Sequence, residues 1–138
     1  MFDHCLYFNT TSLARKLERE WSVAFKPFGL TPSQAFMLRV ILTKPGHHQI
    51  ELAKEMNITK PTASRSLDGL AHLGLIERRG SNKDSRGVQI FPTNHALQIF
   101  DELNAASGEV TKKFKSLLGA EEFDGIVSRL RTISSAID

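Results

Sequence analysis

Apolar residues recur every three or four positions along most of this chain, which predicts a mainly helical protein. Residues 6–28 carry one such stripe and are expected to form a single long helix. Thr93 can cap a second long helix that runs to about Leu118, and a last helix is expected from about Glu121. Isolated amphipathic helices of this length need a partner surface, so these three helices must pack against something.

The centre of the chain has stronger start and stop signals. Residues 31–34 read Thr-Pro-Ser-Gln, which combines an N-cap, a first-turn proline and a capping box. The apolar helix that follows is expected in the core and ends at Pro45 and Gly46. A short helix over 48–56 then leads to Asn57, a residue type that tolerates a left-handed turn.

The next helix starts at Thr59, which is a plausible N-cap. Ala63, Leu67 and Leu70 fall on one side of it, and the opposite side is polar. Two helices joined by so short a turn predict a helix-turn-helix, whose second helix can enter the major groove of DNA. Gly74 is the expected end of this helix.

A β-hairpin is predicted directly after this helix. Its strands are Leu75–Arg79 and Val88–Phe91, and a polar, basic loop between Gly80 and Gly87 joins them. We therefore predict a mainly α fold of the α+β winged-helix type: one domain over residues 1–138, with a winged helix-turn-helix DNA-binding lobe at 30–92. The remaining residues, 1–29 and 93–138, are predicted to be a helical dimerisation region, because their stripes exceed what one small lobe can cover.

The charge distribution favours a nucleic-acid partner. The chain has a net charge of +3 at pH 7. Residues 59–91 hold six Lys or Arg and three Asp or Glu, which also gives +3, so the rest of the chain sums to zero. A local cationic excess is what phosphate neutralisation requires.

These features resemble the MarR family of bacterial winged-helix transcription regulators, and the resemblance covers nearly the whole chain. The motifs that carry it are PTASRSLDGL, LGLIERRG and KDSRGVQIFPT, with Asp84, Arg86 and Thr93 in the family's wing pattern. Ser85 stands where a further arginine is frequent, and Pro92 and Ala96 depart from the usual residues around the threonine. The resemblance implies a homodimer that reads a palindromic operator on double-stranded DNA, usually as a repressor released by a small ligand or by oxidation.

Eight residues are predicted to serve DNA binding. Arg65 is placed nearest a base edge, because a guanidinium can bind guanine O6 and N7 together. Lys60, Thr62 and Ser64 lie in the first helical turns, where phosphates or base edges are in reach. In the wing, Arg86 is the predicted minor-groove residue and Asp84 is predicted to hold it. Arg79 and Lys83 are predicted to contact backbone phosphates.

Regulation is less strongly encoded. A small-molecule effector, if there is one, is expected where the dimer helices meet the lobe, in a pocket that Trp21, Phe25, Phe28 and Phe36 could line; ordinary core packing explains the same residues. Cys5 near Tyr7 suggests a peroxide-sensing alternative, although a thiol without nearby cations is usually unreactive. A regulator controlled only by its abundance is a further alternative.

Other function classes are disfavoured. The five histidines do not pair at ligand spacing, so no metal or other cofactor is expected. No phosphate-binding loop, nucleophile elbow or carboxylate pair appears, so an enzyme is not predicted. The sequence shows neither a signal peptide nor a membrane span, and its one cysteine suits a reducing cytoplasm. A helical protein-interaction module without a DNA role would explain the apolar stripes but not the cationic hairpin.

Overall fold

The computed structural model describes residues 1–80 and 87–137. Its elements follow the order α1 (Leu6–Phe25), a 3₁₀ turn η1 (Lys26–Phe28), α2 (Pro32–Thr43), β1 (His47–His48), α3 (Gln49–Met56), α4 (Lys60–His72), β2 (Ile76–Arg79), β3 (Gln89–Pro92), α5 (Asn94–Leu118) and α6 (Ala120–Ala136). The predicted fold class, a mainly helical winged helix with a small β-hairpin, is confirmed.

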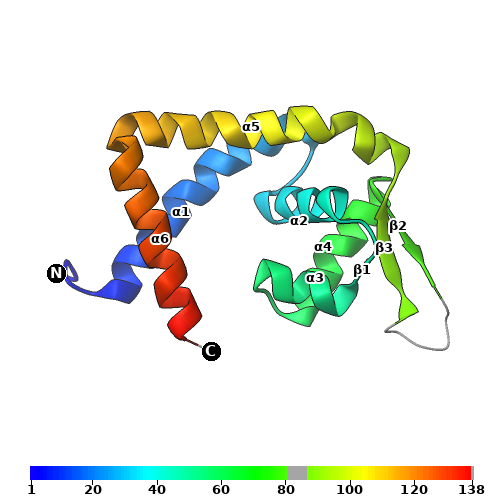
Figure 1. Cartoon of the computed structure of the whole chain (residues 1–138), viewed down its shortest axis with the longest axis horizontal. Helices are drawn as coiled ribbons and strands as arrows, with labels where there is room; N and C mark the ends of the chain where they lie inside the picture. Colours follow the sequence, from blue (N-terminus) through cyan, green and yellow to red (C-terminus); the bar gives the residue numbers. More distant parts are fainter. Residues whose placement is uncertain (81–86, 138) are drawn as a thin grey trace.

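Figure 1 shows two groups of elements joined by α5. A lobe made of α2, α3, α4 and the sheet lies at the end of α5 where this helix begins, and α1 and α6 lie toward its other end. The core of the lobe is built from fully buried side chains: Met37, Leu38, Ile41, Leu52, Leu67, Leu70 and Ile90. Leu103 of α5 and Phe25 of α1 belong to the same core, so the lobe is anchored to both flanking helices.

The helix starts follow the caps that the sequence predicted. The Thr31 hydroxyl accepts a hydrogen bond from the Gln34 N–H at 3.2 Å, and the Gln34 side chain accepts one from the Thr31 N–H at 3.0 Å. Thr93 caps α5, and its hydroxyl also donates to the Gly74 carbonyl at 2.7 Å. This second bond ties the end of α4 to the start of α5.

A proline is involved in two of the boundaries that differ from the predicted ones. The helix expected over 6–28 is α-helical only to Phe25, and its last three residues form the 3₁₀ turn η1 because Pro27 lacks an N–H. Pro92 does not stop the second hairpin strand: it is the last residue of β3 and pairs with Ile76. Proline is tolerated there because it ends the strand.

One strand was not predicted. β1 consists of only two residues and pairs with β3 in an antiparallel three-stranded sheet of order β1-β3-β2. His47 faces Ile90 and His48 faces Gln89 in the register. The pairing connects the end of α2 to the hairpin, so the hairpin is fixed to the lobe on its inner edge.

Candidate nucleic-acid interface

The turn between α3 and α4 sets the direction of α4. Asn57 has φ 55° and ψ 48°, the left-handed conformation that the sequence predicted. The Ile58 N–H donates to the Ala53 carbonyl at 3.0 Å, and Ala53 itself is only 5% exposed. A larger side chain at Ala53 would separate the two helices, so this position requires a small residue.

α4 is buried along one side and bare along the other. Ala63, Leu67 and Leu70 are fully buried, whereas Arg65 and Asp68 are exposed. At its start, the Thr59 hydroxyl accepts the Thr62 N–H at 3.3 Å. This cap leaves the remaining N–H groups of the first turn and the positive end of the helix dipole open to solvent.

α2 holds α4 at very short range. A Cβ added to Gly69 of α4 would collide with the Gln34 side chain of α2, so only glycine permits this approach without rearrangement. Ser33 and Ser66 hydroxyls lie 3.4 Å apart across the same contact. Because α2 also packs on α5, the position of α4 depends on how α2 packs against that long helix.

The structure brings the four DNA-binding residues predicted on α4 into its first two turns. Lys60 and Arg65 are exposed, and neither forms a salt bridge within the described part of the chain. Thr62 and Ser64 are half-buried beside them. Two free cations and two hydroxyls therefore lie next to the capped helix start, which is a suitable set for phosphate and base contacts.

The described part of the hairpin carries two arginines that already have partners. Arg78 donates to Asp68 of α4 at 2.7 Å, which links the hairpin to this helix. Arg79 lies over the Phe91 ring at 4.4 Å and donates to Glu77 at 3.0 and 3.2 Å. Acidic groups of the protein thus partly compensate the charge of these two arginines. The net charge of residues 59–91 does not show this pairing.

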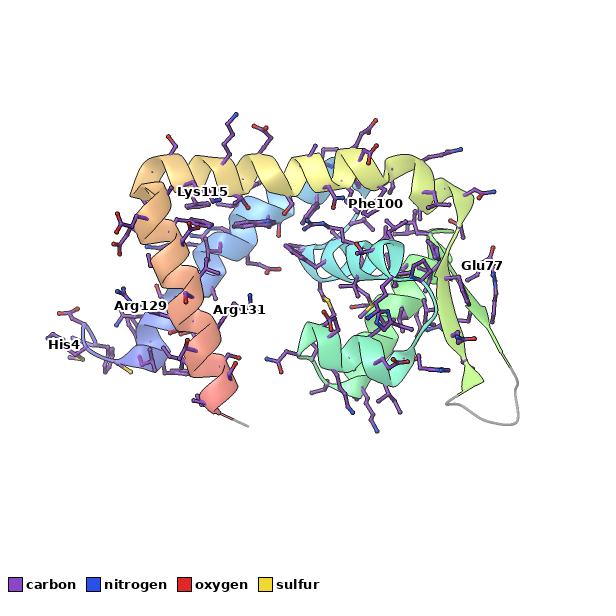
Figure 2. The ribbon with its side chains drawn as sticks, in the orientation of Figure 1. His4, Glu77, Phe100, Lys115, Arg129 and Arg131 are labelled. Carbon is purple, nitrogen blue, oxygen red and sulfur yellow. The ribbon has the colours of Figure 1, made fainter. Side chains whose placement is uncertain are left out.

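The outer strand β2, which carries both arginines, lies at the opposite side of the molecule from α6 (Figure 1). Figure 2 places Glu77 at the sheet side of the molecule, and Arg129 and Arg131 of α6 at the opposite side. The predicted wing residues Lys83, Asp84 and Arg86 lie outside the described residues, as does Ser85.

The four aromatic residues predicted for an effector pocket do not share one cavity. Trp21 stacks on Phe114 of α5 with ring centroids 6.0 Å apart. Phe25 is fully buried and meets Phe36 edge to face at 5.8 Å. Phe28 lines a separate surface cavity near the start of α5. Only Phe36, at 37% exposure, borders a cavity beside the lobe.

That cavity contains a residue that sequence reasoning missed. It has a volume of about 510 Å³ and is lined by Phe36, Arg39, Val40, Thr43, Lys44, His47, Glu55 and Asn104. Arg39 is half-buried on α2, and its guanidinium lies 5.0 Å from the centre of the Phe36 ring. Burial lowers the pKa of Arg39 from its ordinary value, although an arginine remains charged at neutral pH.

Ser107 is the second residue that was missed. It is 5% exposed and accepts hydrogen bonds from Trp21 Nε1 and from Arg39, each at 3.1 Å. The signal was present in the sequence: the apolar stripe of α5 passes from Leu103 to Val110, and Ser107 occupies the position between them. A hydroxyl inside such a stripe indicates a buried polar partner.

The predicted redox residue lies at the surface. Cys5 is exposed and precedes α1 as its N-cap, with the Phe8 N–H directed at Sγ at 3.5 Å. Exposure makes the thiol accessible, but it does not establish reactivity. A peroxide-sensing role for Cys5 stays a prediction.

Within residues 1–80 and 87–137, no three His, Cys, Asp or Glu side chains are grouped so that they could hold a metal ion. In the same residues, none of the helices has the length and apolar character needed to cross a membrane.

Comparison with known proteins identifies the fold and a sequence match to one family over the centre of the chain. Residues 28–87 match the sequence model of the MarR family. A MarR protein from Peptoclostridium difficile has a TM-score of 0.85 and 19% identity, with 98% of this chain and 88% of that one aligned. The Staphylococcus aureus MepR–DNA complex gives 0.79 and 22%, over 99% of this chain and 98% of that one.

The transcriptional repressor CouR is similar in two bound states. Bound to a 23-mer DNA duplex, it has a TM-score of 0.86 and 24% identity, over 96% of this chain and 94% of that one. Bound to p-coumaroyl-CoA, it has the same TM-score and coverages with 22% identity. These likenesses establish a shared fold, and the matched residues 28–87 include α2, β1, α3, α4 and β2. Over residues 28–87, the chain is therefore similar in sequence to the MarR family, and over nearly its whole length it shares the fold of the solved MarR-family structures.

Proposed function

We propose that this chain is a sequence-specific DNA-binding transcriptional regulator that acts as a dimeric repressor on a palindromic operator. The observation that carries the proposal is α4: its inner side is fully buried in the lobe, while Lys60 and Arg65 on its outer side are exposed and have no described salt-bridge partner. A rigidly seated helix with a bare cationic side is suited to the major groove. The MepR and CouR complexes with DNA show that this fold can bind a duplex.

Within this proposal, the residues have different roles. Arg65 reads a base edge, because its fork of donors matches guanine O6 and N7. Lys60, Thr62 and Ser64 contact phosphates or neighbouring bases from the first turns. The wing residues Lys83, Asp84 and Arg86 serve the minor groove and the backbone, and Arg79 joins them by exchanging its contact with Glu77 for a phosphate.

A second copy of the chain is the proposed partner of the helical region. α6 buries none of its side chains, and α1 buries only Phe25. The exposed large apolar residues of these two helices and of the end of α5 are Leu6, Tyr7, Phe8, Leu13, Val23, Leu117, Leu118, Val127, Leu130 and Ile133. Apolar surface of this extent on three neighbouring helices is typical of a protein interface. A two-fold dimer would cover it and would place two α4 helices on one duplex.

The DNA proposal can be tested with the purified full-length chain. Genomic fragments that it retains would be identified, and the affinity for one of them measured at fixed salt for wild type, Arg65→Ala and Lys112→Ala. We expect Arg65→Ala to weaken binding by about tenfold to a hundredfold. Lys112→Ala removes the same charge from exposed α5 and is expected to change affinity little. Equal affinities for all three proteins would contradict the reading role of Arg65.

The dimer can be tested separately. Light scattering coupled to size exclusion should give twice the chain mass of 15.4 kDa. Leu130→Asp places a charge in the exposed apolar side of α6 and should shift the equilibrium to monomer, whereas Arg129→Asp, one residue away, serves as its control. A wild-type protein that is monomeric at micromolar concentration would refute the dimer.

A small-molecule effector is the proposed release signal, and the cavity beside Phe36 is its proposed site. Arg39 has no salt bridge in the described residues, so an anionic ligand with an apolar body would satisfy a cation that only neutral groups hold at present. Aromatic acids should release the chain from its fragment, and their neutral amides should not. Release by neither class would remove this cavity as an effector site.

A further inference from the structure

We propose that Arg39, Asn104, Ser107 and Trp21 form a latch that holds the DNA-reading lobe in one orientation on α5. The inference rests on the proposed function for its biological meaning, because an orientation of the lobe matters only if the lobe reads DNA. Its physical content, a set of hydrogen bonds that fixes the angle between α2 and α5, does not depend on DNA.

The latch joins three helices at one point. Arg39 of α2 donates through Nε to Asn104 Oδ1 at 2.7 Å and through Nη1 to Ser107 Oγ at 3.1 Å, both on α5. Trp21 of α1 donates through Nε1 to the same Ser107 Oγ at 3.1 Å. The lobe, through α2, is therefore bonded to the helix that connects it to the dimerisation region, and α1 closes the group from the other side.

The hydroxyl of Ser107 is the acceptor that two donors of the latch share. A hydroxyl oxygen has two acceptor positions, and here Trp21 and Arg39 fill both. Among the described residues, Ser107 is the only buried polar residue, and every buried side-chain N or O atom has a hydrogen-bond partner. Water therefore has little access to replace the serine, and removing its oxygen would leave two donors, one of them charged, without an acceptor.

The rest of the α2–α5 contact cannot set the angle in the same way. Leu103 and its partly buried neighbours Ile99 and Phe100 pack on the lobe core through apolar contacts. Such contacts hold two helices together, but they are not directional and tolerate a small slide or rotation. Hydrogen bonds from a planar guanidinium to acceptors three residues apart on one helix permit one arrangement. The polar group therefore specifies the orientation that the apolar surface stabilises.

The latch can also be opened. Arg39 is held by an amide, a hydroxyl and the Phe36 ring, and in the described residues by no carboxylate. Neutral acceptors bind a guanidinium less strongly than an anion does. Arg39 and Asn104 both border the 510 Å³ cavity, so a group that captures the guanidinium there would break the bond to Asn104 directly. Occupation of the cavity and orientation of the lobe are coupled through one side chain.

The test measures the orientation directly. Spin labels at Lys54→Cys on α3 and Lys112→Cys on α5, both exposed positions, would report the distance from the lobe to the far half of α5 in a Cys5→Ser background. Dilution with unlabelled protein removes distances between copies. We expect a narrow distribution for the parent and a broadened or shifted one for Ser107→Ala and for Arg39→Lys, which keeps the charge but loses the planar fork.

The matched control is Ser116→Ala, an exposed serine nine positions further along α5. It should leave the distribution unchanged. A purely structural role of Ser107 would lower the melting temperature without broadening the distance, so a distribution as narrow as that of the parent, in folded Ser107→Ala and Arg39→Lys, overturns the latch. Arg39→Lys keeps the test decisive if Ser107→Ala does not fold.

A second readout follows the hydrogen bond itself. Trp21 is the only tryptophan, so the chain gives one indole N–H resonance. Ser107→Ala should shift this resonance by removing its acceptor, and Ser116→Ala should not. An indole resonance that Ser107→Ala leaves in place shows that the Trp21–Ser107 bond is absent in solution and overturns the latch.

Binding to a retained DNA fragment separates the two proposals. If the open lobe adopts the competent orientation a tenth of the time, Ser107→Ala lowers affinity about tenfold. A broadened distance with no DNA binding by wild type refutes the proposed function and leaves the latch standing. A narrow distance in Ser107→Ala with normal DNA binding by wild type refutes the latch alone.

Discussion

The base of the hairpin provides the sharpest test of the fold, because it depends on a glycine for two reasons at once. Gly80 directly follows the first hairpin strand with φ 149°, a backbone conformation that residues with a Cβ avoid. A Cβ at this position would also overlap the Gly87 carbonyl oxygen and approach the Val88 Cα to 2.9 Å. These are backbone atoms of the residues just before β3, so no side-chain rotation relieves the overlap.

The expected effect of Gly80→Ala can be built up from two control glycines. Gly74→Ala has the conformational penalty alone, since its φ is 74° and no atom lies within 4 Å of the added Cβ; it should cost about 1–2 kcal/mol. Gly108→Ala, in α5 and equally unhindered, should stabilise by about 1 kcal/mol. Gly80→Ala adds overpacking of about 1–3 kcal/mol to the conformational term, a total of about 2–5 kcal/mol.

Urea unfolding at one fixed protein concentration gives the free energies for all three variants. Hydrogen exchange at the β2–β3 amides detects the same destabilisation if the hairpin opens locally instead of unfolding with the lobe. The expected order of stability is Gly108→Ala, wild type, Gly74→Ala and Gly80→Ala. The reasoning is refuted if Gly80→Ala is no worse than Gly74→Ala in either measurement.

Three further outcomes test single contacts. A hydrogen bond from the His48 N–H lowers the pKa of Glu51. The stabilisation of α3 by the Glu51 carboxylate should therefore be present above the ordinary glutamate pKa, about 4.3, and be lost as pH falls through the lower folded value. Glu51→Gln should abolish this pH dependence in urea titrations. Thr31→Ala removes half of a capping box and should reduce the unfolding free energy by about 1 kcal/mol. Arg78→Met breaks the exposed pair with Asp68. A double-mutant cycle with Asp68→Asn should give a coupling energy of only about 0.5 kcal/mol. A larger coupling would mean that the pair is more than a surface contact.

The features that the sequence predicted well are those that neighbouring residues determine. Thr31, Thr59 and Thr93 all cap helices as expected, because a cap involves residues two or three positions apart. Asn57 adopts the expected left-handed turn for the same local reason. The helices, the hairpin and their order could therefore be predicted before any tertiary contact was known.

The features that were missed arise from pairs distant in the sequence. β1 is a strand only because His47 and His48 pair with β3, more than forty residues later, and two residues carry no periodic signal. Arg39 interrupts an otherwise apolar helix, and its partners on α5 lie 65 and 68 positions away. A charge pattern could not show that Arg78 and Arg79 already contact Asp68 and Glu77. Four aromatic residues could line one pocket as far as the sequence shows, but Trp21 stacks on Phe114, Phe25 packs against Phe36, and Phe28 and Phe36 line separate cavities.

The unbroken length of α5 has a mechanical consequence. With 25 residues at 1.5 Å per residue, it is a rod of about 37 Å that carries the lobe near one end and α6 at the other. A tilt of about 5° at one end displaces the other by about 3 Å, which is close to the 3.4 Å rise of one base pair. In the proposed dimer, two such levers would turn a small tilt at the α6 end of α5 into a register error of about one base pair at each half-site.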